Sequence, residues 1–146
     1  MSLTRREVCR LIPVLMAAGN AIPAFAARDD SLPSATFPYE CMPAQDFDHA
    51  PRRKIPKGKL ATGGLFEAHA TTLPPNGYPP PPHLRLHSEM WLIREGPVEL
   101  TINGASHRLG PGGLGFVHSN EAHGIKKVGT GPATYFVVAI GPGAST

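Results

Sequence analysis

Four residues able to do chemistry occupy alternate positions in one short segment: His83, Arg85, His87 and Glu89. Alternate side chains of a strand share a face, so these four would project together if the segment stays extended. Imidazoles and a carboxylate on one face make a poor hydrophobic core and a good metal site. His123 begins another predicted strand and could add a third imidazole. His83, Glu89 and His123 then match the two-histidine, one-carboxylate triad of non-haem iron sites.

The elements that must position these residues are predicted to be β-strands. From residue 60 onward, short apolar runs alternate with Gly, Pro and Asn, which is typical of an all-β sandwich or barrel. Asn103-Gly104 is a strong hairpin signal, because both residues tolerate positive φ. The predicted strands are Gly64–Leu73, Glu89–Arg94, Val98–Ile102, Ser106–Leu109, Leu114–Val117, Gly124–Val128 and Thr134–Ile140.

Residues 1–26 are predicted to be an export signal that is later removed. A basic start precedes an apolar stretch, and Ala24-Phe25-Ala26 supplies the small residues of a cleavage site. The stretch is too interrupted to span a membrane, which needs about 20 apolar residues, so we expect no stable membrane anchor after cleavage. The segment Thr4–Arg10, with Arg5 and Arg6, resembles the twin-arginine signal of bacteria. It implies a periplasmic or otherwise extracytoplasmic protein that crosses the membrane folded, with any metal loaded beforehand.

The chain that remains is almost neutral. The signal holds three arginines and one glutamate, which leaves 11 basic and 10 acidic residues of the original 14 and 11. Nucleic-acid binding therefore has little electrostatic support. We interpret residues 27–59 as an extended arm with one short strand near Phe37–Cys41, and its basic run from Arg52 to Lys59 as a solvated linker. Cleavage also removes Cys9, so Cys41 would have no partner within the processed chain.

The segment around the four alternating residues resembles the first motif of the cupin superfamily. That motif is a Gly, five residues, His-x-His, three or four residues, Glu, six residues and a Gly. This chain has Gly77, YPPPP, His83, Leu, Arg85, LHS, Glu89, MWLIRE and Gly96. Every fixed position agrees except one, where Arg85 replaces the second histidine.

The second cupin motif is matched more loosely. Gly112 and His123 stand at the expected positions, whereas His118, Asn120 and Lys127 replace a Pro, a Gly and an Asn. The resemblance covers about residues 60–142. It implies a double-stranded β-helix, the cupin jelly-roll barrel, over residues 60–146, with a divalent metal (Fe, Mn, Zn, Ni or Cu) bound inside.

The replacement at Arg85 leaves the ligand set open, because a guanidinium cannot coordinate a metal. Either three protein residues hold the metal, or His87 supplies a fourth ligand, which we favour slightly. Arg85 could instead clamp an anionic substrate, or pair with Glu89 in a metal-free barrel. His118 lies near the barrel mouth and is a second candidate for catalysis, as an acid or base.

The alternation also predicts what each face of one strand does. Trp91 and Ile93 share the parity of Glu89 and should line the interior, whereas Met90 and Leu92 face outward. Cupin barrels often bury such a face against a second subunit, so we expect a homodimer. The alternative is that the N-terminal arm covers this face within one chain.

The resemblance leaves several functions open. A metalloenzyme acting on a small organic molecule is the first, most plausibly a dioxygenase, although a lyase, isomerase or decarboxylase needs the same parts. A non-catalytic module that binds a small anion or a sugar is the second. A metal-free structural barrel is the third, and fold alone does not choose among them.

Overall fold

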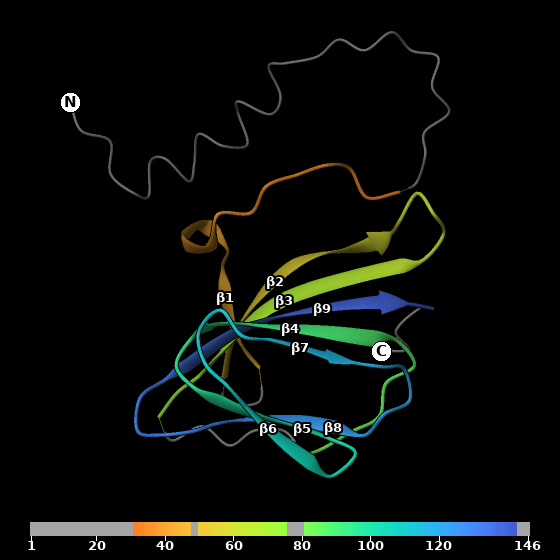
Figure 1. Ribbon diagram of the computed structural model, residues 1–146. Helices are drawn as coiled ribbons and strands as arrows, with labels where there is room; N and C mark the ends of the chain where they lie inside the picture. Colours follow the sequence, from red (N-terminus) through yellow and green to blue (C-terminus); the bar gives the residue numbers. More distant parts are fainter. Residues whose placement is uncertain (1–30, 48–49, 76–80, 143–146) are drawn as a thin grey trace, which may run out of the picture.

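The computed structural model describes residues 31–47, 50–75 and 81–142, and their regular structure is almost entirely β (Figure 1). A 3-10 turn, η1 (Tyr39–Cys41), comes first. The strands are β1 (Ala44–Phe47), β2 (Ala50–Lys59), β3 (Leu65–Leu73), β4 (Ser88–Glu95), β5 (Val98–Ile102), β6 (Ala105–Leu109), β7 (Leu114–Val117), β8 (His123–Lys127) and β9 (Ala133–Gly141). Within these residues no helix is long and apolar enough to cross a membrane.

The strands form two sheets, and every pairing in them is antiparallel. The larger sheet has the order β1-β2-β3-β9-β4-β7, and the smaller has the order β6-β5-β8. Consecutive strands often lie in different sheets, which is how a jelly roll winds its chain. The fold is therefore the all-β jelly roll that the sequence predicts.

The strands predicted from residue 60 onward are confirmed, each within one residue at either end. The turn at Asn103-Gly104 is also confirmed, with φ of 48° and 84°. Positive φ at both residues gives the hairpin a twist that matches its strands. Gly96, which ends the first motif, has a φ of 68°, and a Cβ there would collide with the carbonyl oxygen of Pro132. Glycine is thus required at this turn for its conformation and for its lack of a side chain.

The N-terminal part differs from its prediction. Residues 39–41 form a 3-10 turn rather than a strand, and part of the expected arm enters the larger sheet as β1 and β2. Prolines argue against a strand, and β2 contains Pro51 and Pro56. The strand accommodates Pro56 at a register shift between Lys54 and Lys57, where the ladder with β3 is interrupted.

Tyr39 attaches the 3-10 turn to the larger sheet. Its ring contacts two guanidinium groups, with Cζ of Arg94 3.5 Å and Cζ of Arg53 4.8 Å from the ring centroid. It also meets Phe136 edge to face at 6.0 Å. Arg53 therefore does not belong to a solvated linker. Cys41 is disulfide-bonded in the full-length chain; the prediction of an unpaired Cys41 concerns the processed chain and stays a prediction.

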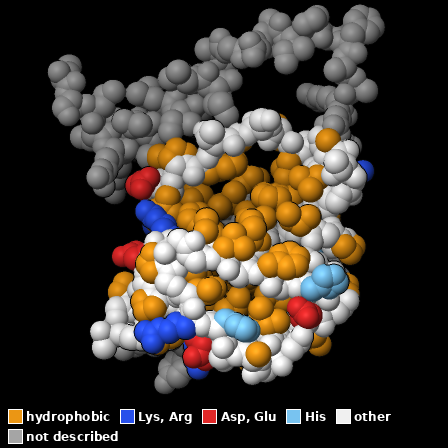
Figure 2. Space-filling model, in the orientation of Figure 1, with side chains coloured by type: hydrophobic (Ala, Val, Ile, Leu, Met, Phe, Trp, Pro, Cys, Tyr) orange, Lys and Arg blue, Asp and Glu red, His pale blue; other side chains and the backbone are white. Residues whose placement is uncertain are grey.

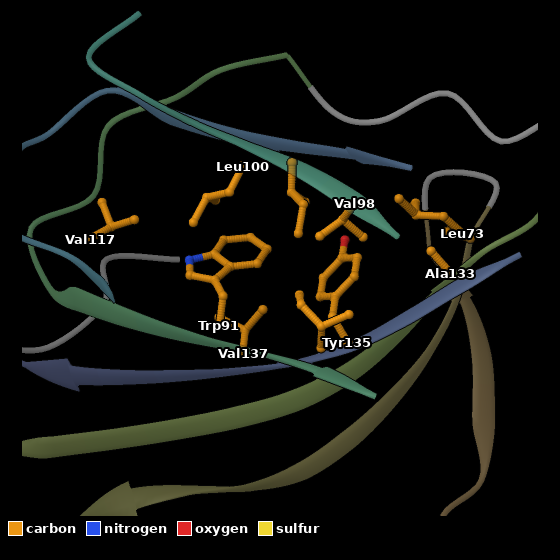
Figure 3. Packing of buried hydrophobic residues seen from close by; sticks show 11 residues of the cluster. Leu73, Trp91, Val98, Leu100, Val117, Ala133, Tyr135 and Val137 are labelled. Carbon is orange, nitrogen blue, oxygen red and sulfur yellow. The ribbon is translucent and has the colours of Figure 1, made fainter. Parts of the chain in front are cut away.

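The hydrophobic core lies between the two sheets. Figure 3 shows Trp91, Tyr135 and Val137 of the larger sheet extending toward Val98 and Leu100 of the smaller one. Each buried aliphatic side chain of this kind stabilises the fold by about 1.5–3 kcal/mol. The alternation predicted for β4 is confirmed, since Trp91 is 5% exposed and Met90 on the opposite face is 36% exposed.

Candidate metal and ligand site

Glu89 is the centre of a polar cluster inside the barrel. It lies in β4, is 7% exposed, and is paired with Ala139 of β9 and Val117 of β7. Two imidazoles contact its carboxylate: Nε2 of His87 lies 2.9 Å from Oε1, and Nε2 of His123 lies 3.1 Å from Oε2. A carboxylate buried among apolar side chains needs such partners. The structure thus brings together three of the four predicted metal ligands.

The fourth predicted ligand, His83, is held against His123. The two residues exchange both backbone hydrogen bonds, at 2.9 and 3.0 Å, and their ring centroids lie 4.8 Å apart. Gly124 permits this approach, because a Cβ there would lie 3.3 Å from Cα of Pro82. His83 is half-buried, and no hydrogen bond joins its ring to Glu89 in the described part of the chain.

The position of His87 depends on the last residue of β9. Gly141 has a φ of 152°, and a Cβ there would lie 3.2 Å from both Cα and Cβ of His87. The absence of a side chain lets the end of β9 pass directly against His87. His87 directly precedes β4, with its imidazole turned inward to Glu89, and is only 9% exposed.

Backbone carbonyls orient two of the imidazoles. Nδ1 of His123 lies 2.8 Å from the carbonyl oxygen of Glu121, and Nδ1 of His83 lies 3.2 Å from that of Pro81. A carbonyl only accepts, so Nδ1 carries the hydrogen in both rings. A neutral ring then has its lone pair on Nε2, which is the tautomer that metal-binding histidines commonly adopt.

The protonation of the cluster follows from these contacts. Burial by itself would raise the pKa of Glu89, but the hydrogen bonds from His123 and His87 outweigh burial and lower the pKa. Burial would lower the pKa of His123, whereas its bonds to Glu89 and to the Glu121 carbonyl raise it. The pKa of His83 is lowered, first by burial. When no other cation is present, the positive charge of protonated His123 balances the negative charge of Glu89.

The donor atoms have the pairwise spacing of metal ligands, but they do not surround a common point. Adjacent ligands about 2.1 Å from an octahedral metal lie roughly 3 Å apart. The distances from Glu89 to His87 and to His123, 2.9 and 3.1 Å, match that spacing. However, among residues 31–47, 50–75 and 81–142 no three His, Cys, Asp or Glu side chains surround a common point at which an ion would fit. The ligand types fit a divalent metal, and coordination would require the side chains to turn from one another toward it.

Arg85 and His118 lie outside this cluster. Residues 84–87 do not form a strand, and the chain bends at Leu86 and His87. The four side chains therefore do not lie along one extended strand. Arg85 is exposed, and its carbonyl accepts a bond of 2.7 Å from the backbone N–H of Asn120. His118 is exposed, with Nδ1 3.1 Å from the carbonyl oxygen of Ser119. Their catalytic roles stay predictions.

His69 and Arg52 face the barrel interior from β3 and β2. His69 is paired with Val137, which is paired with Trp91, so all three share the inward face. Burial, followed by the positive charge of Arg52, lowers the pKa of His69 to about 4. Arg52 is predicted to lie in a solvated linker, and the structure corrects this. Period-two alternation with buried Ala50 is the signal that could have placed Arg52 inside.

An open pocket at one end of the barrel reaches His87. It is lined by apolar residues of β3 and β9, including Phe66 and Ala139, and by Lys57 and Glu67. The Lys57 ammonium and the Glu67 carboxylate form an ion pair at 3.2 Å. The volume of the pocket, about 10 Å³, has room for roughly one water molecule, so in this conformation the pocket is too small for an organic ligand. His87 lines this pocket and also contacts Glu89.

Comparison with known proteins agrees with this architecture. Residues 69–139 match the family model described as a cupin domain. An RmlC-like cupin from Shewanella frigidimarina superposes with a TM-score of 0.62 at 16% identity, over 77% of this chain and 95% of that one. A predicted oxalate decarboxylase from Thermotoga maritima gives 0.61 at 17% identity, over 73% and 99%. KdgF from Halomonas sp. gives 0.62 at 16% identity, over 73% and 94%.

At such identities the solved structures establish the fold and not the activity. No curated protein matches the sequence. The family match lies where the two motifs lie, and it spans the strands that carry Glu89, His123 and His69. Residues 69–139 therefore match the cupin domain in sequence, and the chain has the all-β jelly-roll fold of the cupin barrels.

Proposed function

We propose that this protein is an exported metal-binding cupin and a metalloenzyme that acts on a small organic molecule, most plausibly as a dioxygenase. The observation that carries the proposal is the pair of imidazoles at 2.9 and 3.1 Å from the two oxygens of buried Glu89. A buried cluster of this composition is costly to maintain unless a cation or a ligand compensates it.

The ligands would be His87, Glu89 and His123, with His83 beside them. A divalent metal bound there would act as a Lewis acid and could support oxygen chemistry. The chain's own contribution is to fix the tautomers of His83 and His123 through backbone carbonyls and to enclose the site with apolar walls, of which Trp91 is one. Low local dielectric strengthens every charge interaction there.

A second candidate is a metal-free barrel that binds a small anion or sugar. The favouring observation is that Glu89 is already paired with His87 and His123. The raised pKa of His123 lets that residue carry the compensating charge. Protein purified after export from its native host decides between the two. Metal analysis followed by an oxygen-uptake screen should find about one transition metal per chain and a substrate-dependent consumption of oxygen. A protein without metal would favour the second candidate.

The proposal includes a homodimer formed through the outer face of the larger sheet. Met90 of β4 is paired with Phe116 of β7, and Leu92 with Leu114, and all four are 36–60% exposed. Figure 2 shows hydrophobic side chains gathered over this sheet. A second copy would bury them.

A further inference from the structure

The indole N–H of Trp91 is a buried donor without an acceptor in the part of the chain that the structure describes. Trp91 is 5% exposed, and its Nε1 has no hydrogen-bond partner among these residues. An indole nitrogen can only donate. A buried donor left unsatisfied costs about 1–3 kcal/mol, so native structures rarely keep one without a ligand, an ion or a water molecule that completes it.

The direction of this N–H points to the candidate site. In Figure 3 the indole nitrogen is on the side of Trp91 that faces Val117, which is paired with Glu89. The indole also meets the ring of His123 edge to face, with centroids 6.1 Å apart. Tyr135 packs against the indole with its centroid 5.3 Å away, which restricts the ring to this orientation.

The charges on the neighbouring wall indicate the kind of acceptor. Arg52 is paired with Thr71, and Thr71 with Tyr135, so Arg52 belongs to the inward row beside that of Trp91. Its positive charge acts on His69 and on Tyr135, and the negative charge of Glu89 acts on both in the opposite direction. The proposed divalent metal beside Glu89 would outweigh that single negative charge. An anionic oxygen is therefore a better partner for the indole than a neutral one, and a hydrogen bond to a charged group is the stronger kind.

We propose that Trp91 donates its Nε1–H to a carboxylate of the ligand that binds beside Glu89, His87 and His123, and so acts as a positioning residue. The inference rests on the proposed metal site and extends it, because it names the chemical class of the ligand. It assigns to Trp91 a polar role in addition to its place in the core.

The test uses the single tryptophan of the chain. Zinc is diamagnetic, so zinc-loaded, ¹⁵N-labelled protein should show one indole N–H resonance. Titration with acetate as the probe should move its proton signal downfield and slow its exchange with water, saturating at the affinity that calorimetry measures. Acetamide, which has the same shape without the charge, should bind at least about tenfold more weakly.

Trp91→Phe should weaken acetate binding about tenfold or more, with zinc affinity unchanged, as expected for the loss of a hydrogen bond to a charged group. Phe116→Leu, on the outer face, should leave acetate affinity unchanged. If acetate binds but the indole signal does not respond, the donor is satisfied by water and the inference is wrong, whereas the metal site stands. If wild-type protein takes up no zinc, the proposed function fails and this inference fails with it.

Discussion

His83 and His123 are 40 positions apart in the chain, yet each accepts the backbone N–H of the other and their rings lie 4.8 Å apart. Neither residue is in the same sheet as Glu89, which His123 reaches at 3.1 Å. The site is therefore assembled from the larger sheet, the smaller sheet and the loop that precedes β4. Substitutions on each of these parts should have separable effects.

Metal binding should depend on the histidines that contact or adjoin Glu89. His123→Ala and His83→Ala should each reduce the affinity for a divalent transition metal by more than about 10–100-fold. That range is what is expected when the lost residue only hydrogen-bonds to a metal ligand. Titration calorimetry and elemental analysis measure this. Exposed His107→Ala is the control and should bind normally. Full occupancy in the His83→Ala/His123→Ala double variant would contradict the site assignment.

His87 should behave as a ligand and Arg85 should not. His87→Ala should weaken metal binding about as much as His83→Ala, because His87 contacts the Glu89 carboxylate at 2.9 Å. Arg85→Ala should spare the metal, since this side chain is exposed. Arg85→His restores the family motif and should tighten binding only if the bend at residues 86–87 can straighten. Normal affinity in His87→Ala would reduce the site to three ligands.

Acid should destabilise the metal-free protein partly through His69. Its pKa falls from 6.5 to about 4 on folding, so the folded state binds fewer protons than the unfolded state between these values. The contribution of His69 to stability is complete above pH 6.5 and is lost as the pH falls toward 4, at up to about 1.4 kcal/mol per pH unit. Urea unfolding of His69→Gln should show a shallower decline over this range. His107→Gln should keep the wild-type slope, and an unchanged slope in His69→Gln would refute the prediction.

The outer face of the larger sheet should mediate dimerisation. Light scattering should give twice the mass of the processed chain for wild-type protein. Phe116→Asp should dissociate it, because a buried unpaired charge opposes association. Leu84 is 62% exposed and Phe116 is 60% exposed, so Leu84→Asp outside the sheet is a matched control that should remain dimeric. A wild-type monomer at micromolar concentration would exclude this interface.

Export should require both arginines of the signal. Arg5→Lys combined with Arg6→Lys should leave uncleaved precursor in the cytoplasm, detected by fractionation and immunoblotting. The twin-arginine pattern has a Lys at the position of Arg10, so Arg10→Lys should leave export intact. If the double-lysine variant reaches the periplasm at the wild-type yield, folded export and cytoplasmic metal loading lose their support. Arg5, Arg6 and Arg10 lie outside the residues that the structure describes.

The sequence by itself determined the strands from residue 60 onward, the Asn103-Gly104 turn, and which side of β4 faces inward. These features depend on local rules: a strand alternates its faces every second residue, and certain turns need positive φ. The presence of His83, Glu89 and His123 in one site could also be anticipated, because their spacing matches a known motif.

Tertiary structure decided which neighbouring residues complete the site. Arg85 and His87 have the same parity, yet a bend exposes one and Gly141 leaves room for the other to turn inward. Arg52 lies inside because β3 pairs with β2 despite its prolines. Such outcomes depend on contacts between residues far apart in the chain. The alternation of inward and outward residues along one strand carries no information about these contacts, because they form only when the strands assemble into sheets.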